Sequence, residues 1–194
     1  MVKKKQELKS HKESAEKLLL QFARTLKKFL PNFNKYLSAI EEPRQKKKCD
    51  YQLKDLMWLS LLLLSLSLGS RNNYNQELRY SESLELLNKI FGLELESIPH
   101  GDTLAYLWEK LSTDDLEKLR HTMVSTLIKG KYLDKFRFRG TFLVAFDGVE
   151  LYRWNEKHCD NCLYAEIKEG KYQYFHRVLE AKIVCANGFA ISIA

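Results

Sequence analysis

Four residues near the C-terminal end have types and spacing that suit a transition metal. His158, Cys159 and Cys162 lie within five residues, and His176 follows in the next predicted strand. Two thiolates in a Cys-x-x-Cys turn can chelate one tetrahedral zinc ion, and neutral imidazoles can supply the other ligands. The sequence lacks a second Cys-x-x-Cys pair, so an alternative to the zinc site stays open. In that alternative the two cysteines are small buried thiols in a loop and His176 is a half-buried strand residue.

An acid stands inside the stretch TFLVAFDGVELYRW, from Thr141 to Trp154. Asp147 follows six residues that are typical of a buried strand, and a buried carboxylate is costly unless it is paired, hydrogen-bonded or bound to a cation. However, Asp147-Gly148 is also a dipeptide that commonly forms a tight hairpin turn. The stretch alone favours the turn and leaves a cation ligand as the alternative.

The third group is basic. Lys46, Lys47 and Lys48 end a linker, and residues 1–48 carry 14 Lys/Arg against 5 Asp/Glu, a net charge of +9 in a chain whose total is +7. Such a segment suits the phosphates of nucleic acid or an anionic surface. It is equally typical of a solvated, lysine-rich helix. We interpret the triplet as a candidate DNA contact.

Helical periodicity extends from the N-terminus to about Arg139. The stretch SRNNYNQ is expected to be a polar loop between two of the helices. The pattern predicts a helix over Leu18–Leu30 that Pro31 ends and a short helix over Phe33–Ile40. It then predicts an apolar helix that Asp50 caps and Gly69 ends, and a helix over Leu84–Phe91 that stops at Gly92. Two more helices follow, one that Asp102 or Thr103 caps and one that begins with a Ser112/Asp115 capping box and ends at Gly130.

From Thr141 the periodicity changes to that of strands. TFLVAFD and VELYRW are predicted to form a first pair, YQYFHRVLEAKIVC a long strand, and FAISIA a strand after the turn ANG. The fold class is therefore α+β, with helices followed by consecutive antiparallel strands. We predict a basic helical segment at 1–48, a helical domain at 49–139 and the strands at 140–194. A sheet of so few strands leaves a face uncovered, so we expect it to belong to a larger domain.

The most apolar run, Leu56 to Leu68, is 13 residues long. A membrane-spanning helix needs about 20 apolar residues, so this run is predicted to be a buried core helix. The alternative is an interaction helix that packs against a partner. The N-terminus has no apolar secretory core. We therefore expect a cytoplasmic protein with reduced cysteines and no membrane contact.

Five stretches in order, IPHGDTL, FLVAFDGVELY, HCDNCL, GKYQYFHRVLEAKIV and NGFAISIA, resemble the N-terminal half of a bacterial DDE-type transposase of the broad IS4-like group. The resemblance covers Cys49 to Ala194 and does not extend to residues 1–48. It implies a helical N-terminal region for DNA, followed by a catalytic domain with a ribonuclease-H-like fold. That catalytic domain would be incomplete in this chain.

The resemblance implies that Asp147 is the first catalytic acid and a ligand for Mg²⁺ or Mn²⁺. Two such ions about 3.5–4 Å apart stabilise the attacking and leaving oxygens of a phosphodiester displacement. The second and third acids are expected beyond Ala194, so this chain alone should be catalytically silent. The predicted strands and their loops contain other acids, but none of them is expected to replace the second or third catalytic acid. These acids are Glu150, Glu156, Asp160, Glu166, Glu169 and Glu180.

The resemblance also implies partners. Transposases of this kind act on double-stranded DNA at transposon ends, as dimers or larger assemblies. The Cys/His cluster recurs in the family, which favours a structural Zn²⁺ that braces the insertion between two strands. Two alternatives remain open: a stand-alone DNA-binding module that uses the basic segment, and a helical interaction protein.

Overall fold

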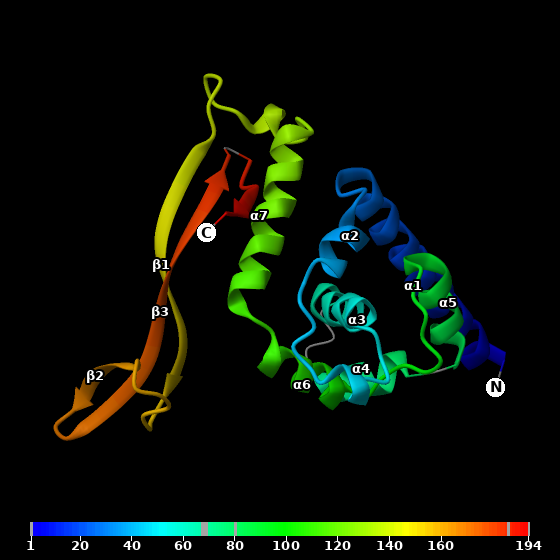
Figure 1. Ribbon diagram of the computed structural model, residues 1–194, viewed down its shortest axis with the longest axis horizontal. Coiled ribbons are helices and arrows are strands. Elements are labelled where there is room, and N and C mark those ends of the chain that lie inside the picture. The colour runs from blue at the N-terminus through cyan, green and yellow to red at the C-terminus, as the bar shows by residue number, and fades with distance from the viewer. Residues whose placement is uncertain (1, 67–69, 80, 186, 194) are drawn as a thin grey trace. The chain divides into compact units, whose positions relative to one another are not determined.

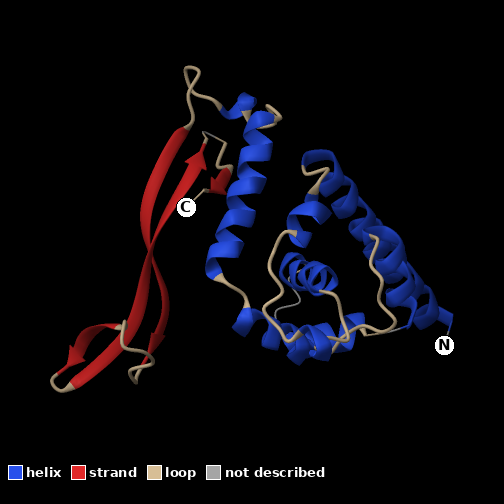
Figure 2. Cartoon of the chain, viewed as in Figure 1, coloured by secondary structure: helices blue, strands red, loops and turns tan. Residues whose placement is uncertain are grey.

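The computed structural model describes residues 2–66, 70–79, 81–185 and 187–193. The chain divides into two compact units, Met1–Gly130 and Lys131–Ala194. The first unit is helical, and the second carries a four-stranded antiparallel sheet (Figures 1 and 2). The α+β class expected from the sequence is therefore confirmed.

Helices of widely different length build the first unit. Their bounds are α1 (Val2–Phe29), α2 (Phe33–Ser38), the 3-10 helix η1 (Lys46–Lys48), α3 (Leu53–Ser65), α4 (Arg71–Leu78), α5 (Ser81–Phe91), α6 (Gly101–Lys110) and α7 (Thr113–Lys129). Leu19 of α1 and Leu30, which follows this helix, belong to the same hydrophobic core as α3. The basic N-terminal segment thus folds together with the helices that follow it.

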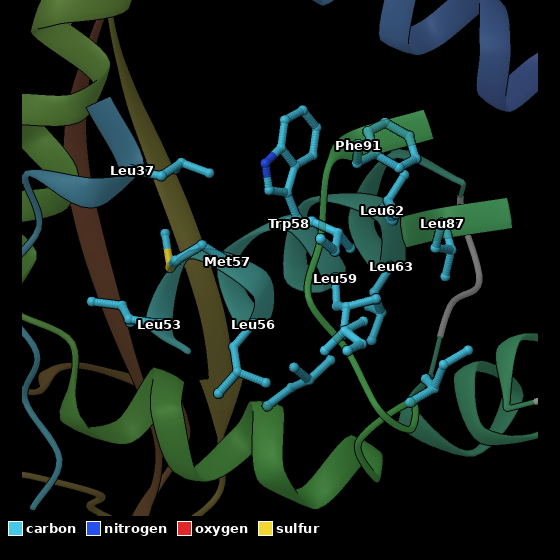
Figure 3. Close-up of a cluster of buried hydrophobic side chains, with 14 of the residues drawn as sticks. Leu37, Leu53, Leu56, Met57, Trp58, Leu59, Leu62, Leu63, Leu87 and Phe91 are labelled. Carbon is cyan, nitrogen blue, oxygen red and sulfur yellow. The ribbon is translucent and has the colours of Figure 1, made fainter. Parts of the chain in front are cut away.

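Helix α3 lies at the centre of this core (Figure 3). Leu56, Leu59 and Leu62 are fully buried, and the Trp58 ring lies 4.8 Å from that of Phe91. The prediction of a core helix is confirmed. Neighbouring helices of the same unit cover these side chains, whereas Leu64 of the same helix is 69% exposed. The alternative that this helix packs against a partner stays a hypothesis. Among the described residues, no helix combines the length and the apolarity that crossing a membrane requires.

The stretch expected to be a polar loop is instead helix α4. The Ser70 side chain accepts a hydrogen bond from the Asn73 N–H at 3.1 Å and caps its N-terminus. Tyr74 and Leu78, four residues apart, are both buried. Two apolar side chains at helical spacing are thus enough to fix a short helix to the core, although most of its residues are polar.

Several helix ends differ from the predicted residues. Helix α3 begins after Gln52 instead of Asp50, and α6 is capped by the His100 ring, which accepts from the Asp102 N–H. Ser112 precedes α7 as predicted, but its side chain makes no capping hydrogen bond. Helix ends depend on how neighbouring turns meet the core, so local sequence places them only to within a residue or two.

Two of the predicted glycine stops are confirmed. Gly92 follows α5 with φ +65°, the left-handed conformation that favours glycine at a helix end, and Gly130 closes α7. Helix α3 ends at Ser65, and Gly69 lies outside the described residues.

The sheet of the second unit is organised around its longest strand. Strand β3 pairs with β1 along one edge, while β2 and β4 pair with opposite ends of its other edge. A 3-10 helix, η2, precedes the sheet. The bounds are η2 (Asp134–Phe136), β1 (Leu143–Trp154), β2 (Leu163–Lys168), β3 (Lys171–Val184) and β4 (Ala190–Ser192).

The predicted turn at Asp147-Gly148 is wrong. Both residues lie inside β1 and pair with Glu180 and Leu179 of β3. A two-residue hairpin turn of the favoured type needs positive φ at both central residues, and Gly148 is not among the positive-φ glycines. TFLVAFD and VELYRW are therefore one continuous strand, with an irregularity only between Glu150 and Arg153.

The expectation that the first strand is buried is also wrong. Phe146 is 70% exposed, and most other side chains of β1 are exposed too. The buried sheet residues lie on β3 instead, at Phe175, Ala181 and Ile183. An apolar run predicts a strand, but it does not reveal whether anything covers that strand. Strand β2 lies between the predicted strands, in a stretch for which the sequence pattern predicts no strand.

Candidate metal centre and the acidic strand

Three of the four predicted metal ligands meet in the structure. Cys159 and Cys162 lie in the turn between β1 and β2, and His176 projects from β3. The two Sγ atoms are 3.7 Å apart, and His176 Nε2 lies 3.3 Å from Cys159 Sγ and 3.5 Å from Cys162 Sγ. Strand pairing thus brings a distant histidine to the cysteine turn.

These distances fit one zinc ion. With Zn–S about 2.3 Å and Zn–N about 2.0–2.1 Å, tetrahedral angles place two sulfurs about 3.8 Å apart and a sulfur and a nitrogen about 3.6 Å apart. The observed separations of 3.7, 3.3 and 3.5 Å are within about 0.3 Å of these values. The cluster could therefore hold a metal ion with little rearrangement.

The backbone of the turn supports thiolate character. The Cys159 N–H donates to Cys162 Sγ at 3.3 Å, and the Cys162 N–H donates to the Cys159 carbonyl at 3.2 Å. Desolvation raises the pKa of the Cys162 thiol, but hydrogen bonds from the Cys159 and His158 backbone outweigh it, so this pKa is lowered overall. A lowered thiol pKa favours metal binding because the thiolate is the ligand.

His158, the fourth predicted ligand, is not in the cluster. Its ring stacks on Trp154 at 5.0 Å with an interplanar angle of 13°. Trp154 also meets the His176 ring edge-on at 5.8 Å. A tetrahedral zinc needs a fourth ligand, which His158 would supply only after leaving Trp154.

Asp147 lies in the middle of β1 with its side chain exposed. Within the described part of the chain its carboxylate has no hydrogen bond or ion pair, and the register partner of Asp147 on β3 is Glu180. Register partners share one face of the sheet, so a second carboxylate stands beside Asp147. Glu180 Oε2 is held 2.8 Å from Lys182 Nζ. Sequence reasoning missed this neighbour because only the pairing register reveals it.

Other acids of the second unit serve local structure. Glu150 pairs with Arg153 and Arg177, Lys157 contacts Asp160, and Glu166 accepts the Gly170 N–H in the β2–β3 turn. Glu156 and Glu169 are exposed. Within the described residues, none of these acids forms a hydrogen bond with the Asp147 side chain.

The basic linker separates into two parts. Arg44, with 6% of its side chain exposed, pairs with Glu42 and donates to the Tyr51 carbonyl, so its charge is used inside the first unit. Lys46 to Lys48 form η1, are exposed, and make no ion pair among the described residues. These three lysines are therefore free to meet an external anion.

Comparisons with protein-family models, with curated proteins and with solved structures found no match to this chain. Functional assignment therefore rests on the residues and on their geometry. Two arrangements carry it: the Cys/His cluster, and the exposed acid on β1.

Proposed function

We propose that this chain is the N-terminal part of a DDE-type transposase of the broad IS4-like group, with DNA cleavage and strand transfer as the activity of the complete protein. The observation that carries the proposal is the position of Asp147, whose carboxylate is unpaired and stands in the middle of β1. The residues of β1 before and after Asp147 both pair with β3, so the backbone of Asp147 is held in place. A strand fixes a metal ligand more precisely than a loop does.

The sheet supports the same proposal. Three antiparallel strands, β1, β3 and β4, lie side by side, as expected for the start of a ribonuclease-H-like domain. Large apolar side chains are exposed along β1, including Leu143 and Val144, which are adjacent in sequence and therefore point to opposite faces of the sheet. Apolar side chains on both faces suit a sheet that further layers of a larger domain cover.

Each group then has a role. Asp147 would hold Mg²⁺ or Mn²⁺, which supplies Lewis-acid stabilisation of the phosphodiester oxygens. The two other acids would come from sequence that follows residue 194. Zn²⁺ at Cys159, Cys162 and His176 would tie the β1–β2 turn to β3. Lys46 to Lys48 would contact phosphates of the transposon end.

The natural coding DNA beyond the codon for Ala194 tests the proposal. We expect an open frame there that encodes further strands, an Asp and a helical Glu. The absence of such a frame in any phase would overturn the catalytic part. In parallel, the purified chain should not nick supercoiled plasmid with Mg²⁺. Nicking that Asp147→Asn abolishes would show that the chain completes the active site itself.

A stand-alone DNA-binding module is the second candidate. It is favoured by the first unit, which has its own hydrophobic core and displays three exposed lysines on η1. This function would need neither Asp147 nor metal ions.

A further inference from the structure

A short segment that begins inside η2 and leads toward β1 alternates basic and aromatic side chains. We call Lys135–Thr141 the basic–aromatic loop; its sequence is KFRFRGT. Figure 1 shows it as the yellow-green loop that leads into β1. The Phe138 side chain is 54% exposed, and both Lys135 and Arg139 are exposed. The loop therefore presents cations and a flat apolar ring to solvent together.

The tip of this loop is a tight turn. Phe138 and Thr141 exchange two backbone hydrogen bonds, of 2.8 and 3.0 Å, and enclose Arg139-Gly140 with φ +49° and +82°. This turn usually has Asn, Asp or Gly at its first central position. An arginine there is held in a conformation that long side chains rarely adopt, and such strain persists mostly at functional positions.

Other contacts hold the tip in place. Arg137 pairs with Asp134 at 2.8 Å, donates to the Gly140 carbonyl at 3.0 Å, and lies over the Phe142 ring at 4.2 Å. The Phe136 ring stacks on Phe189 at 4.4 Å with an angle of 16°. Because these groups are already engaged, Arg137 and Phe136 build the platform. Binding is left to the other side chains.

Lys135 and Phe138 border a hollow of about 410 Å³, within the usual range for ligand clefts. Lys135 Nζ lies 4.8 Å from the centre of the Phe136 ring, and the Arg139 guanidinium lies 5.4 Å from the centre of the Phe138 ring. No acid lines the hollow; the lining is Lys135, Phe136, Arg137, Phe138, Leu143, Val184, Cys185 and Asn187. Among the described residues, neither Lys135 nor Arg139 has a carboxylate partner, whereas Asp134 is neutralised by Arg137. The site is therefore electropositive, with an apolar ring at its edge.

We propose that the basic–aromatic loop binds a single DNA strand, with Arg139 and Lys135 on phosphates and the Phe138 ring stacked on an unpaired base. Cations alone would suit any polyanion, but an exposed aromatic ring beside them gains additional energy when an unpaired base stacks on it. This extends the proposed function by naming the form of DNA and the residues that contact it. It requires neither Asp147 nor a metal ion.

Fluorescence anisotropy tests the proposal on the full chain, without added Mg²⁺ or Mn²⁺. The probes are fluorescein-labelled twelve-nucleotide oligothymidylate, a duplex of equal length and polyglutamate. We expect Phe138→Ala to weaken oligothymidylate binding about tenfold or more and to leave the duplex unaffected, because a ring carries no charge. Phe146→Ala, which removes an exposed ring from β1, is the matched control and should change neither. Phe138→Trp should preserve binding and shows that the loop tolerates substitution.

Arg139→Asn removes the charge and keeps a residue that accepts positive φ. It should lower the magnitude of the salt slope of oligothymidylate binding by about 0.7, the value for one phosphate contact on a single strand. Lys168→Gln, on β2, should not. Equal losses for Phe138→Ala and Phe146→Ala, equal binding of polyglutamate, or no loss at all would overturn the inference. Because no cleavage is measured, a failed search for the missing acids would leave this result intact.

Discussion

The Cys/His cluster shows how much at the residue scale depends on one turn. The backbone N–H of Cys159 is aimed at the sulfur of Cys162, and His176 reaches both sulfurs from a neighbouring strand. The separations of these three ligand atoms are close to those of a tetrahedral metal site, so the cluster could hold a metal ion. His158 is adjacent in sequence but is engaged with Trp154.

We expect His176→Ala to lower zinc affinity at least 100-fold and His158→Ala to lower it less than tenfold, because only His176 lies with the sulfurs. Competition titration with a chromophoric chelator measures both, and Co²⁺ absorption confirms thiolate ligation. Affinity should also fall with decreasing pH, since protons compete for the thiolates. Equal losses for the two histidine variants would show that His158 is a ligand.

Asp55 is the second residue whose environment makes a prediction. Its side chain is 1% exposed, Oδ2 accepts the Glu94 N–H at 3.4 Å, and Oδ1 lies 3.7 Å from Lys54 Nζ without a hydrogen bond. Burial raises the pKa of this carboxyl, and Lys54 opposes the rise only in part. The charged form is therefore disfavoured in the folded protein.

The sign of the pH effect follows. Because folding raises the pKa of Asp55, this residue contributes its full share of stability below its unfolded pKa of 3.8. That contribution is lost as the pH rises through the folded-state pKa. Asp55→Asn should thus raise the free energy of unfolding at pH 7 by about 1 kcal/mol and remove this part of the pH dependence. Urea unfolding from pH 4 to 8 measures it, with exposed Glu85→Gln as control. A loss of stability at pH 7 would contradict the prediction.

Helix α3 shows at the element scale how one apolar helix divides between core and surface. Leu59 is fully buried, whereas Leu64 of the same helix is 69% exposed. Leu59→Ala should cost about 2–5 kcal/mol of unfolding free energy, and Leu64→Ala less than about 0.5 kcal/mol. Urea unfolding of the two variants gives the comparison. Similar losses would mean that Leu64 also lies against other residues.

Strand β1 offers a direct test of strand against turn. A Cβ at Gly148 or at Gly170 would meet no atom within 4 Å, but only Gly170 has positive φ, at +72°. Gly148→Val should therefore leave stability unchanged or raise it by up to about 1 kcal/mol. Gly170→Val should lower it by about 1 kcal/mol or more. Thermal unfolding measures both effects. A large loss of stability in Gly148→Val would contradict the strand and favour the hairpin turn at Asp147-Gly148.

Charge distribution matters at the scale of the whole molecule. The three exposed lysines of η1 are unpaired among the described residues and belong to the most basic quarter of the chain. Replacing Lys46, Lys47 and Lys48 by Gln should weaken duplex DNA binding and reduce the salt slope by up to about 2.7, for three phosphate contacts. Lys110, Lys118 and Lys129, replaced together, are the charge-matched control. Unchanged binding would exclude η1 as a DNA contact.

Local sequence alone determined the helices with strong periodicity, the change from helix to strand near residue 141, and the helix stop at Gly92. Each depends on residues a few positions apart, so a short window contains the information. Tertiary structure alone decided that Asp147 lies inside a strand opposite Glu180, and that His176 joins the cysteines while His158 does not. Those outcomes depend on strand register, which joins residues distant in sequence, and no local pattern encodes it.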